Sequence, residues 1–412
     1  MKKALVIGGT EDHVRLILLL KARGFYTLLM DYYPNPPAAS YADEHIRESA
    51  LDCDRALEVA QTHQVALTIA LCIDQAILTM AYVSERMGTP CYLTHQQALC
   101  FTNKSFMKVK MLEGSIPTSK FLVIRKGEDK QEALKSLSFP VVVKPVDSNG
   151  SKGVTRVDHP EELGTALQRA FGFTHDGRAI VEEFVQGDEY SIELFLQEGE
   201  PVLVSHTKTV KTDLHKNLFV TVSSCAPSGL IKEDQVALLD IGRAISKVFG
   251  YRSGPLLVQC LKGRDRLSVI EFSARIGGGS KHHFIKEDRG CDYLGHLVRF
   301  ALGKGVGPIQ VRTEELHTRC HFVYARPGII GRITGLAELL ADSRVKAFYQ
   351  YKSEGMKVTD NNSSSHRVLG FIVQAEDRHR IEEATRLVDE GLAVLDPDGR
   401  DLMIHGLYRI LE

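Results

Sequence analysis

Three polar side chains alternate along the stretch LSVIEFSAR: Glu271, Ser273 and Arg275. In a β-strand they would share one face, and a three-residue turn after the preceding run PLLVQCLKG would set Gln259 directly across from Glu271. A carboxylate, an amide oxygen and a hydroxyl that converge suit a hard cation such as Mg²⁺. Arg275 stands at the mouth of Gly277–Gly279, where it suits a phosphoryl group or a carboxylate. A solvated strand edge would also explain Glu271 and Arg275, but not the three glycines.

A second stretch, VVVKPVDSNGSKGV, ends a β-branched run at Lys144 and then breaks into small residues between Ser148 and Gly153. A lysine at the end of a strand supplies a point charge for an anion. Small residues let backbone N–H groups lie close against such an anion, and glycine also permits a positive φ. The alternative is an ordinary hairpin turn.

A third pattern lies in EYSIELFL, where Glu189 and Ser191 share one strand face. A two-residue loop at Glu198-Gly199 would place Glu189 opposite Lys208 and Ser191 opposite His206 in the next strand. The simpler interpretation is a solvated sheet face with a cross-strand ion pair worth about a few tenths of a kcal/mol.

The composition is that of an ordinary globular protein: 412 residues, 43% hydrophobic and 25% charged, with a formal net charge of −1. This balance gives no reason to expect nucleic acid or an anionic membrane as a partner. No apolar run approaches the ~20 residues that cross a bilayer, and the N-terminal KALVIGG is typical of a first strand. The eight cysteines show no CxxC spacing, which indicates reduced thiols and predicts a cytoplasmic protein.

The order of the elements predicts an α/β and α+β fold in three parts. Residues 1–95 alternate strands with amphipathic helices, which indicates a parallel, Rossmann-like domain. Residues 96–310 mix helices with strands in hairpin order, and residues 311–412 form a smaller α+β unit. The loop GGTEDHV lacks the third glycine of GxGxxG, which argues against a nicotinamide dinucleotide site. An anion at the N-terminus of the first helix stays open.

Taken in order, these stretches resemble the motifs of the ATP-grasp superfamily, in particular its carboxylate–amine ligases, such as amino-acid ligases and carbamoyl phosphate synthetase. TNKSFMK resembles the lysine-bearing entry helix, and VVVKPVDSNGSKGV the strand lysine with its glycine-rich flap. VEEFVQGDEYS resembles the adenine hinge with the ribose carboxylate, and VQC with IEFSARIGGG the metal-binding hairpin. The resemblance implies a Rossmann-like N-terminal domain (1–95), a two-subdomain ATP-grasp fold (96–185 with the flap, 186–310 with the metal site) and a small α+β C-terminal domain (311–412).

The resemblance also implies roles for the matching residues. The nucleotide phosphates would be held by Lys104, Lys144 and the flap residues Ser148, Asn149, Gly150, Ser151 and Gly153. The hinge would consist of Glu182, Glu183 and Val185, with backbone groups of the last two on the adenine edge, and Glu189 would bind the ribose. Catalysis at the γ-phosphate would fall to Lys208 and Arg275, and Mg²⁺, or alternatively Mn²⁺, to Gln259, Glu271 and Ser273. Substrate contacts would come from Gly277, Gly278, His282 and His283, although the two histidines could equally be structural.

The implied reaction joins a small carboxylate and a small amine at the expense of ATP, through an acyl phosphate, with release of ADP and phosphate. Gln259 stands where many relatives carry a carboxylate, and Ser273 where asparagine is usual, so metal affinity would be weak. These departures support a second hypothesis, an ATP-binding regulatory protein with a degenerate site. A homodimer is expected only because relatives are often dimeric.

Overall fold

The N-terminal part of the computed structural model, which describes residues 1–128, 131–148, 152–213, 219–264, 266–313, 316–359 and 366–408, is a parallel sheet flanked by helices. Its strands follow the order β3-β2-β1-β4, with β1 Lys2–Ile7, β2 Phe25–Met30, β3 Glu44–Ile46 and β4 Leu67–Ala70. The helices are α1 Asp12–Lys21, α2 Cys53–His63 and α3 Asp74–Met87, with a 3₁₀ turn η1 Ala39–Tyr41. Because the strands run parallel, the loops after β1, β2 and β4 open at one edge of the sheet.

Two further helices, α4 His95–Thr102 and α5 Lys104–Glu113, lead out of this domain. Asn103 separates them, and its side-chain oxygen accepts a hydrogen bond from the N–H of Ser105 at 3.0 Å, as an N-cap does. The cap makes Lys104 the first residue of α5. Phe101 of α4 packs edge-to-face against Phe272, so both helices join the core of the following sheet.

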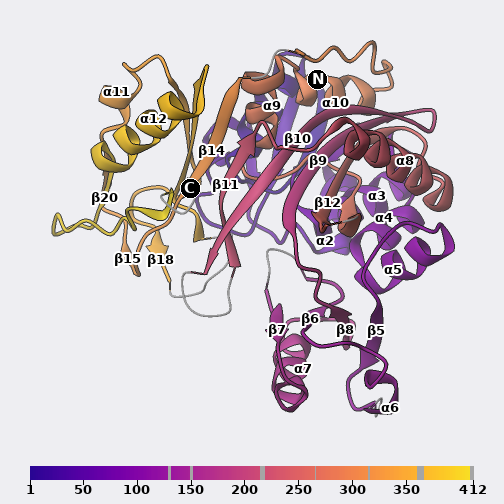
Figure 1. Cartoon of the computed structure of the whole chain (residues 1–412). Helices are drawn as coiled ribbons and strands as arrows, with labels where there is room; N and C mark the ends of the chain where they lie inside the picture. Colours follow the sequence, from indigo (N-terminus) through magenta and orange to yellow (C-terminus); the bar gives the residue numbers. More distant parts are fainter. Residues whose placement is uncertain are drawn as a thin grey trace.

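A small antiparallel sheet, here called the lid, stands apart from the rest of the chain at the bottom of Figure 1. Its strand order is β5-β8-β6-β7, with β5 Phe121–Arg125, β6 Val141–Pro145, β7 Thr155–Val157 and β8 Arg178–Glu183. Helices α6 Gln131–Leu134 and α7 Leu163–Phe171 and the 3₁₀ turn η2 Pro160–Glu162 complete it. The lid has its own small core, in which Val141, Val143 and Val181 pack against Ala166 of α7.

An eight-stranded antiparallel sheet forms the body of the molecule, in the order β13-β12-β9-β10-β11-β14-β19-β17. The strands are β9 Asp188–Gln197, β10 Glu200–Asp213, β11 Phe219–Ala226, β12 Gly254–Lys262, β13 Leu267–Ser273, β14 His317–Val323, β17 Val345–Gln350 and β19 Leu369–Ala375. Helices α8 Lys232–Phe249, α9 Lys281–Arg289 and α10 Tyr293–Ala301 accompany it. The C-terminal part adds β15 Gly328–Ile329, β16 Arg332–Thr334, α11 Leu336–Leu339, β18 Lys357–Val358, α12 Arg378–Gly391 and β20 Ala393–Leu395.

The predicted fold class is confirmed: a Rossmann-like sheet precedes a lid, a larger antiparallel sheet and a small α+β unit. The body sheet runs from β11 directly into β14, so the C-terminal unit shares its hydrogen-bonded sheet with the part before residue 310. All eight cysteines are unpaired. In the parts of the chain that the structure describes, none of the helices combines the length and apolar character that a membrane crossing requires.

The β9–β10 hairpin has the predicted two-residue loop but not the predicted register. Gln197 pairs with Glu200 on either side of the loop, yet a bulge between Leu203 and Ser205 shifts every later pair by one residue. Glu189 therefore lies opposite Thr209, and the expected pairing of Glu189 with Lys208 is wrong. The expected pairing of Ser191 with His206 fails for the same reason.

The β12–β13 hairpin places Gln259 opposite Glu271, as predicted. The predicted three-residue turn is wrong, because Lys262 pairs with Leu267 and leaves four residues between them. A bulge between Gln259 and Cys260 compensates for the longer turn. The two deviations cancel, so the polar face survives intact.

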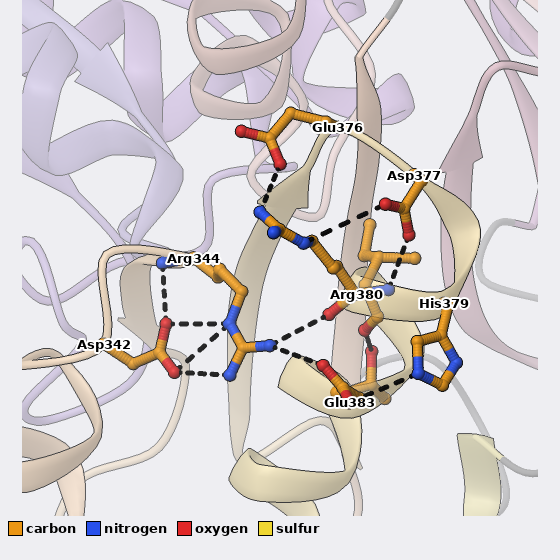
Figure 2. A network of polar contacts seen from close by, with 9 residues as sticks. Asp342, Arg344, Glu376, Asp377, His379, Arg380 and Glu383 are labelled. Carbon is orange, nitrogen blue, oxygen red and sulfur yellow. Dashed lines mark hydrogen bonds and ion pairs between the residues drawn. The ribbon is translucent and has the colours of Figure 1, made fainter.

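A network of charged side chains ties the start of β17 to the start of α12 (Figure 2). Arg344 contacts Asp342 at 2.7 Å and Glu383 at 3.1 Å, and it also reaches the carbonyl of Arg380. Arg380 in turn pairs with Glu376 at 2.7 Å. The residues are partly or largely exposed, so each pair contributes at most about 1 kcal/mol. The network orients α12 on the sheet more than it stabilises the fold.

We expect Arg344→Ala to reduce the fall in the free energy of unfolding between pH 6 and pH 3. The hydrogen bond from Arg344 holds the pKa of Asp342 below its usual value, so its stabilising contribution is complete above that value and is lost as the pH falls below it. Urea denaturation between pH 6 and pH 3 measures the effect, and Lys346→Ala, two residues further on in β17, is the control. Identical pH slopes for wild type and Arg344→Ala would refute this assignment.

Candidate active site

One large cavity lies where the N-terminal sheet, the lid and the body sheet meet. Its volume is about 1430 Å³. The N-terminal domain contributes Asp74, the lid contributes Lys144 and Glu182, and the body contributes Glu271 and Arg275. Residues from three parts of the chain therefore face one space.

Most of the residues singled out in the sequence line this cavity. They are Lys104, Lys144, Ser148, Glu182, Glu183, Val185, Glu189, Lys208, Gln259, Glu271, Arg275, Gly277 and Gly278. Ser273 lines a small adjoining cavity together with Gln259 and Glu271. Asn149, Gly150 and Ser151 lie outside the described residues. Gly153 has a φ of +72° and a Cβ there would meet Phe173; it is not itself a lining residue, although its neighbours Lys152 and Val154 are.

Glu182 is clamped between two lysines in the lid-side wall. Its carboxylate lies 2.6 Å from Lys144 Nζ and 2.8 Å from Lys108 Nζ, and all three side chains are buried. Burial opposes the charged carboxylate, but the two ammonium groups outweigh it and lower the pKa of Glu182 to about 2. Ser119 also donates to this carboxylate at 2.7 Å. Lys108 did not emerge from the sequence, because a lysine on an entry helix is usually solvated.

Lys104 connects the start of α5 to the β12–β13 hairpin. Its Nζ lies 3.1 Å from Glu271 Oε2 and donates to the carbonyl of Ser148 at 2.8 Å. Burial works against its charge, yet Glu271 and Asp74 raise the pKa of Lys104 above its ordinary value. The lysine therefore stays charged beside the predicted metal carboxylate.

Arg275 is held by a carboxylate from the N-terminal domain. Its Nε donates to Asp74 Oδ1 at 2.6 Å, and its Nη1 donates to the carbonyl of Ile276 at 2.9 Å. Arg275 is 7% exposed, so most of its guanidinium is committed to these contacts and the remainder faces the cavity. Asp74 was not predicted, because 201 residues separate it from Arg275.

The donors around Gln259, Glu271 and Ser273 fit a small hard cation. They line a cavity of about 10 Å³, enough for one water-sized particle, and Asp74 and Lys104 line it as well. Ser273 Oγ is buried there and has no hydrogen-bond partner among the described residues. Oxygen donors of three kinds suit Mg²⁺. Within the described residues no three His, Cys, Asp or Glu side chains could hold a metal, so such a site depends on the amide and the hydroxyl.

Glu189 and Lys208 take other partners than the sequence suggested. Glu189 pairs with Lys211 at 2.5 Å, and Lys208 pairs with Asp188 at 2.8 Å. The bulge in β10 is the cause, because it turns Lys211 rather than Lys208 towards Glu189. Lys208 remains in the lining of the cavity.

His282 and His283 are not among the residues that line the cavity, so their prediction as substrate contacts is corrected. His282 Nε2 lies 3.2 Å from the carbonyl of Asp12, and burial lowers its pKa. His283 stacks on Tyr349 with ring centroids 4.2 Å apart. Helix α9 directs both rings towards the start of α1, where His283 Nε2 lies 3.9 Å from Glu11 Oε1.

The three glycines at positions 277 to 279 differ in how strictly the structure requires a glycine. Gly277 donates its N–H to Glu193 Oε1 at 3.0 Å, and a Cβ there would overlap that oxygen. Gly279 has a φ of +74°, and a Cβ would collide with Arg367 and Phe322. A Cβ at Gly278 would meet no atom closer than 3.5 Å. The run therefore brings the backbone close to two charged side chains.

Arg367 is a further cavity residue that the sequence did not reveal. It lies 3.7 Å over the ring of Phe322 and donates to Tyr324 Oη at 3.3 Å. Its charge partly offsets the burial that raises the pKa of the Asp12 carboxyl. It follows the polar stretch DNNSSSH, and nothing in the sequence indicated that its side chain turns inwards.

Comparison with known proteins gives a consistent picture. Residues 137–282 match the family model of the ATP-grasp domain. The chain is 24% identical over 333 residues to the L-arginine-specific L-amino acid ligase of Bacillus subtilis, covering 77% of both chains. It is 26% identical over 162 residues to the D-alanine–D-alanine ligase of Flavobacterium psychrophilum, covering 38% of this chain but only 48% of that one. The solved L-amino acid ligase of Bacillus licheniformis has the same fold, with a TM-score of 0.78, 20% identity and coverage of 96% and 99%.

We expect Glu182→Gln to lower the free energy of unfolding by about 3 kcal/mol at neutral pH, because two buried lysines lose their counter-charge. The folded-state pKa of Glu182, about 2, lies below the ordinary value of 4.5 for a glutamate. Its contribution is therefore complete above pH 4.5 and is lost as the pH falls towards 2. Urea denaturation at pH 7 and pH 3 measures both effects, with Glu183→Gln as the neighbouring control. Equal stability of the two variants at pH 7 would refute the stabilising role of the contacts between Glu182 and the two lysines.

Proposed function

We propose that this chain, which carries an ATP-grasp domain, is an ATP-dependent carboxylate–amine ligase that forms an amide or peptide bond and releases ADP and phosphate. The observation that carries the proposal is the meeting of Lys104, Arg275 and the Gln259–Glu271 pair in one cavity beneath the lid. Cations and a metal-binding face at one point are what phosphoryl transfer to a carboxylate requires.

The proposed reaction has two steps. A carboxylate oxygen of the first substrate attacks the γ-phosphorus of ATP, the bond to the β–γ bridging oxygen breaks, and ADP leaves. The amine nitrogen of the second substrate then attacks the carbonyl carbon of the acyl phosphate. The C–O bond to phosphate breaks, a proton leaves the nitrogen, and the amide remains. The chain needs no nucleophile of its own for this sequence, because alignment and charge neutralisation supply the catalysis.

The nucleotide would lie between the lid and the body sheet. Lys104 and Lys144 would contact the phosphates, with Ser148 beside them, and Glu189 would take the ribose. In the hinge, the N–H of Glu183 already donates to the carbonyl of Lys120 at 2.9 Å. The adenine edge would therefore use the carbonyl of Glu183 and the backbone of Val185.

Gln259, Glu271 and Ser273 would hold Mg²⁺, or alternatively Mn²⁺, at the small cavity beside the phosphates. A bound cation there would neutralise charge that develops on the transferred phosphoryl group. Arg275 would stabilise the same charge from the substrate side, and Lys208 would assist from β10. Closure of the lid would keep water from the acyl phosphate, which water would otherwise hydrolyse.

A regulatory ATP-binding protein is the second candidate, favoured only by the neutral side chains of Gln259 and Ser273. Phosphate and ADP release with Mg²⁺-ATP, measured against single and paired pools of small carboxylates and amines, separates the two. Release that needs both a carboxylate and an amine supports the ligase. Tight ATP binding without release for any pair supports the regulatory protein.

We expect Arg275→Ala to reduce ADP release by about 100-fold or more, because one preorganised charged donor at developing charge contributes about that factor. ATP binding should persist, and Arg275→Lys should retain part of the rate. Arg243→Ala on the surface of α8 is the matched control, and a thermal melt checks that Arg275→Ala is folded. Full ligation activity in a folded Arg275→Ala protein would exclude the proposed role.

We expect the double variant Gln259→Glu, Ser273→Asn to reach half-maximal ADP release at a lower Mg²⁺ concentration than wild type. A second carboxylate and a stronger acceptor raise the affinity of the site for a hard cation. Titration of Mg²⁺ at fixed total ATP measures the shift. An unchanged or higher Mg²⁺ requirement would place the metal elsewhere.

A further inference from the structure

The segment after β2 presents exposed aromatic side chains to the cavity. Tyr32 is 55% exposed and Tyr33 is 49% exposed, and both line the cavity, with ring centroids 4.1 Å apart and planes tilted by 32°. Pro36, Pro37 and Leu51 line the same end, and Leu51 is 51% exposed. Together these five residues are here called the aromatic shelf. Large apolar side chains left exposed inside a cavity indicate a surface that a ligand covers.

The shelf is held in a fixed shape by the loop after β1. Asp31 accepts hydrogen bonds from the N–H of Gly9 at 2.8 Å and from the N–H of Tyr33 at 2.9 Å. A Cβ at Gly9 would lie 2.8 Å from Pro36, so glycine allows the two loops to pack directly together. A proline fixes φ and leaves little freedom in the segment. The shelf is therefore preorganised, which lowers the entropic cost of binding a ring.

The position of the shelf assigns it to the substrate and not to the nucleotide. It follows β2, whereas Asp74, the partner of Arg275, follows β4, and β1 lies between these two strands. The strands that carry the shelf and Asp74 are therefore two strand spacings apart, about 10 Å. The hinge residues Glu183 and Val185 lie at and just after the end of the lid strand β8, on another wall of the cavity. A cavity of about 1430 Å³ exceeds the size usual for one ligand, about 300–1,000 Å³, and leaves room beyond the nucleotide.

We infer that one substrate of the proposed ligation carries an aromatic ring on an extended arm, and that the ring lies on the Tyr32–Tyr33 shelf while its reacting group lies at Arg275. This inference rests on the proposed function for the identity of the reacting group. The ring would stack on or against the tyrosines with offset or edge geometry. An arm of about 10 Å, two strand spacings, is needed to connect the two places.

Binding of simple probes tests the shelf without any turnover. The probes are phenylalkanoates from phenylacetate to 6-phenylhexanoate, the matching phenylalkylamines, and the straight-chain acids and amines that lack the ring. Each is titrated calorimetrically into the full chain saturated with Mg²⁺ and a non-hydrolysable ATP analogue. In wild type we expect the ring to raise affinity at least tenfold for the longer arms in one of the two series. The series that responds tells whether the acid or the amine substrate bears the ring.

Three variants locate the effect. Tyr32→Ala with Tyr33→Ala should remove the gain from the ring and leave the affinity of the straight-chain probes unchanged. Tyr32→Phe with Tyr33→Phe should keep the gain, because the ring and not the hydroxyl makes the contact. Tyr41→Ala, an exposed tyrosine of the same segment outside the cavity lining, is the control. A thermal melt establishes that each variant is folded.

The outcomes separate this inference from the proposed function. No gain from the ring in either wild-type series, or a gain that persists in the double alanine variant, overturns the shelf even where ADP release shows a ligase. A gain that the double alanine variant abolishes supports the shelf, and it does so even if no carboxylate and amine pair gives ADP release, which would count against the ligase alone.

Discussion

A buried cation must have an anion beside it, since removing an ammonium or guanidinium group from water costs several kcal/mol that packing alone does not return. The centre of this molecule depends on that constraint. Its cations find their anions on other elements of the fold, in the pairs Arg275–Asp74, Lys104–Glu271 and Lys144–Glu182. The first pair joins α3 of the N-terminal domain to the segment that follows the β12–β13 hairpin, and the second joins α5 to the same hairpin. The charges that suit phosphoryl transfer thus also hold the walls of the cavity together.

Whether a contact could be predicted from the sequence depends on how far apart its residues lie in the chain. Strand alternation and turn length are local, so Gln259 opposite Glu271 was predicted correctly, although an unforeseen bulge was needed to offset a longer turn. In the neighbouring hairpin a single bulge had no such compensation, and the predicted partner of Glu189 was wrong. Alternation cannot reveal a bulge, because the extra residue has no signature of its own.

Contacts between segments distant in the sequence could not be predicted from strand alternation or turn length. Asp74 begins an ordinary helix in the sequence, and only the folded chain brings it 2.6 Å from Arg275. Arg367 follows a polar stretch and turns inwards onto Phe322, which no periodicity indicates. For His282 and His283 the sequence predicted a place in the cavity that the folded chain does not give them. Their neighbours in the sequence suggested the cavity, whereas the direction of α9 sends them to the start of α1.

The contact between Lys104 and Glu271 has a consequence for the order in which ligands arrive. Glu271 is engaged by the lysine at 3.1 Å in the chain alone, so a free divalent cation would have to compete with an ammonium group for the same carboxylate. A cation that enters bound to a polyphosphate would take the Glu271 carboxylate from Lys104, and the phosphate groups would pair with Lys104 in its place. The number of paired charges would then stay the same. In the proposed ligase, metal and nucleotide would therefore enter as one complex, and the affinity for the metal alone would say little about the affinity for the pair.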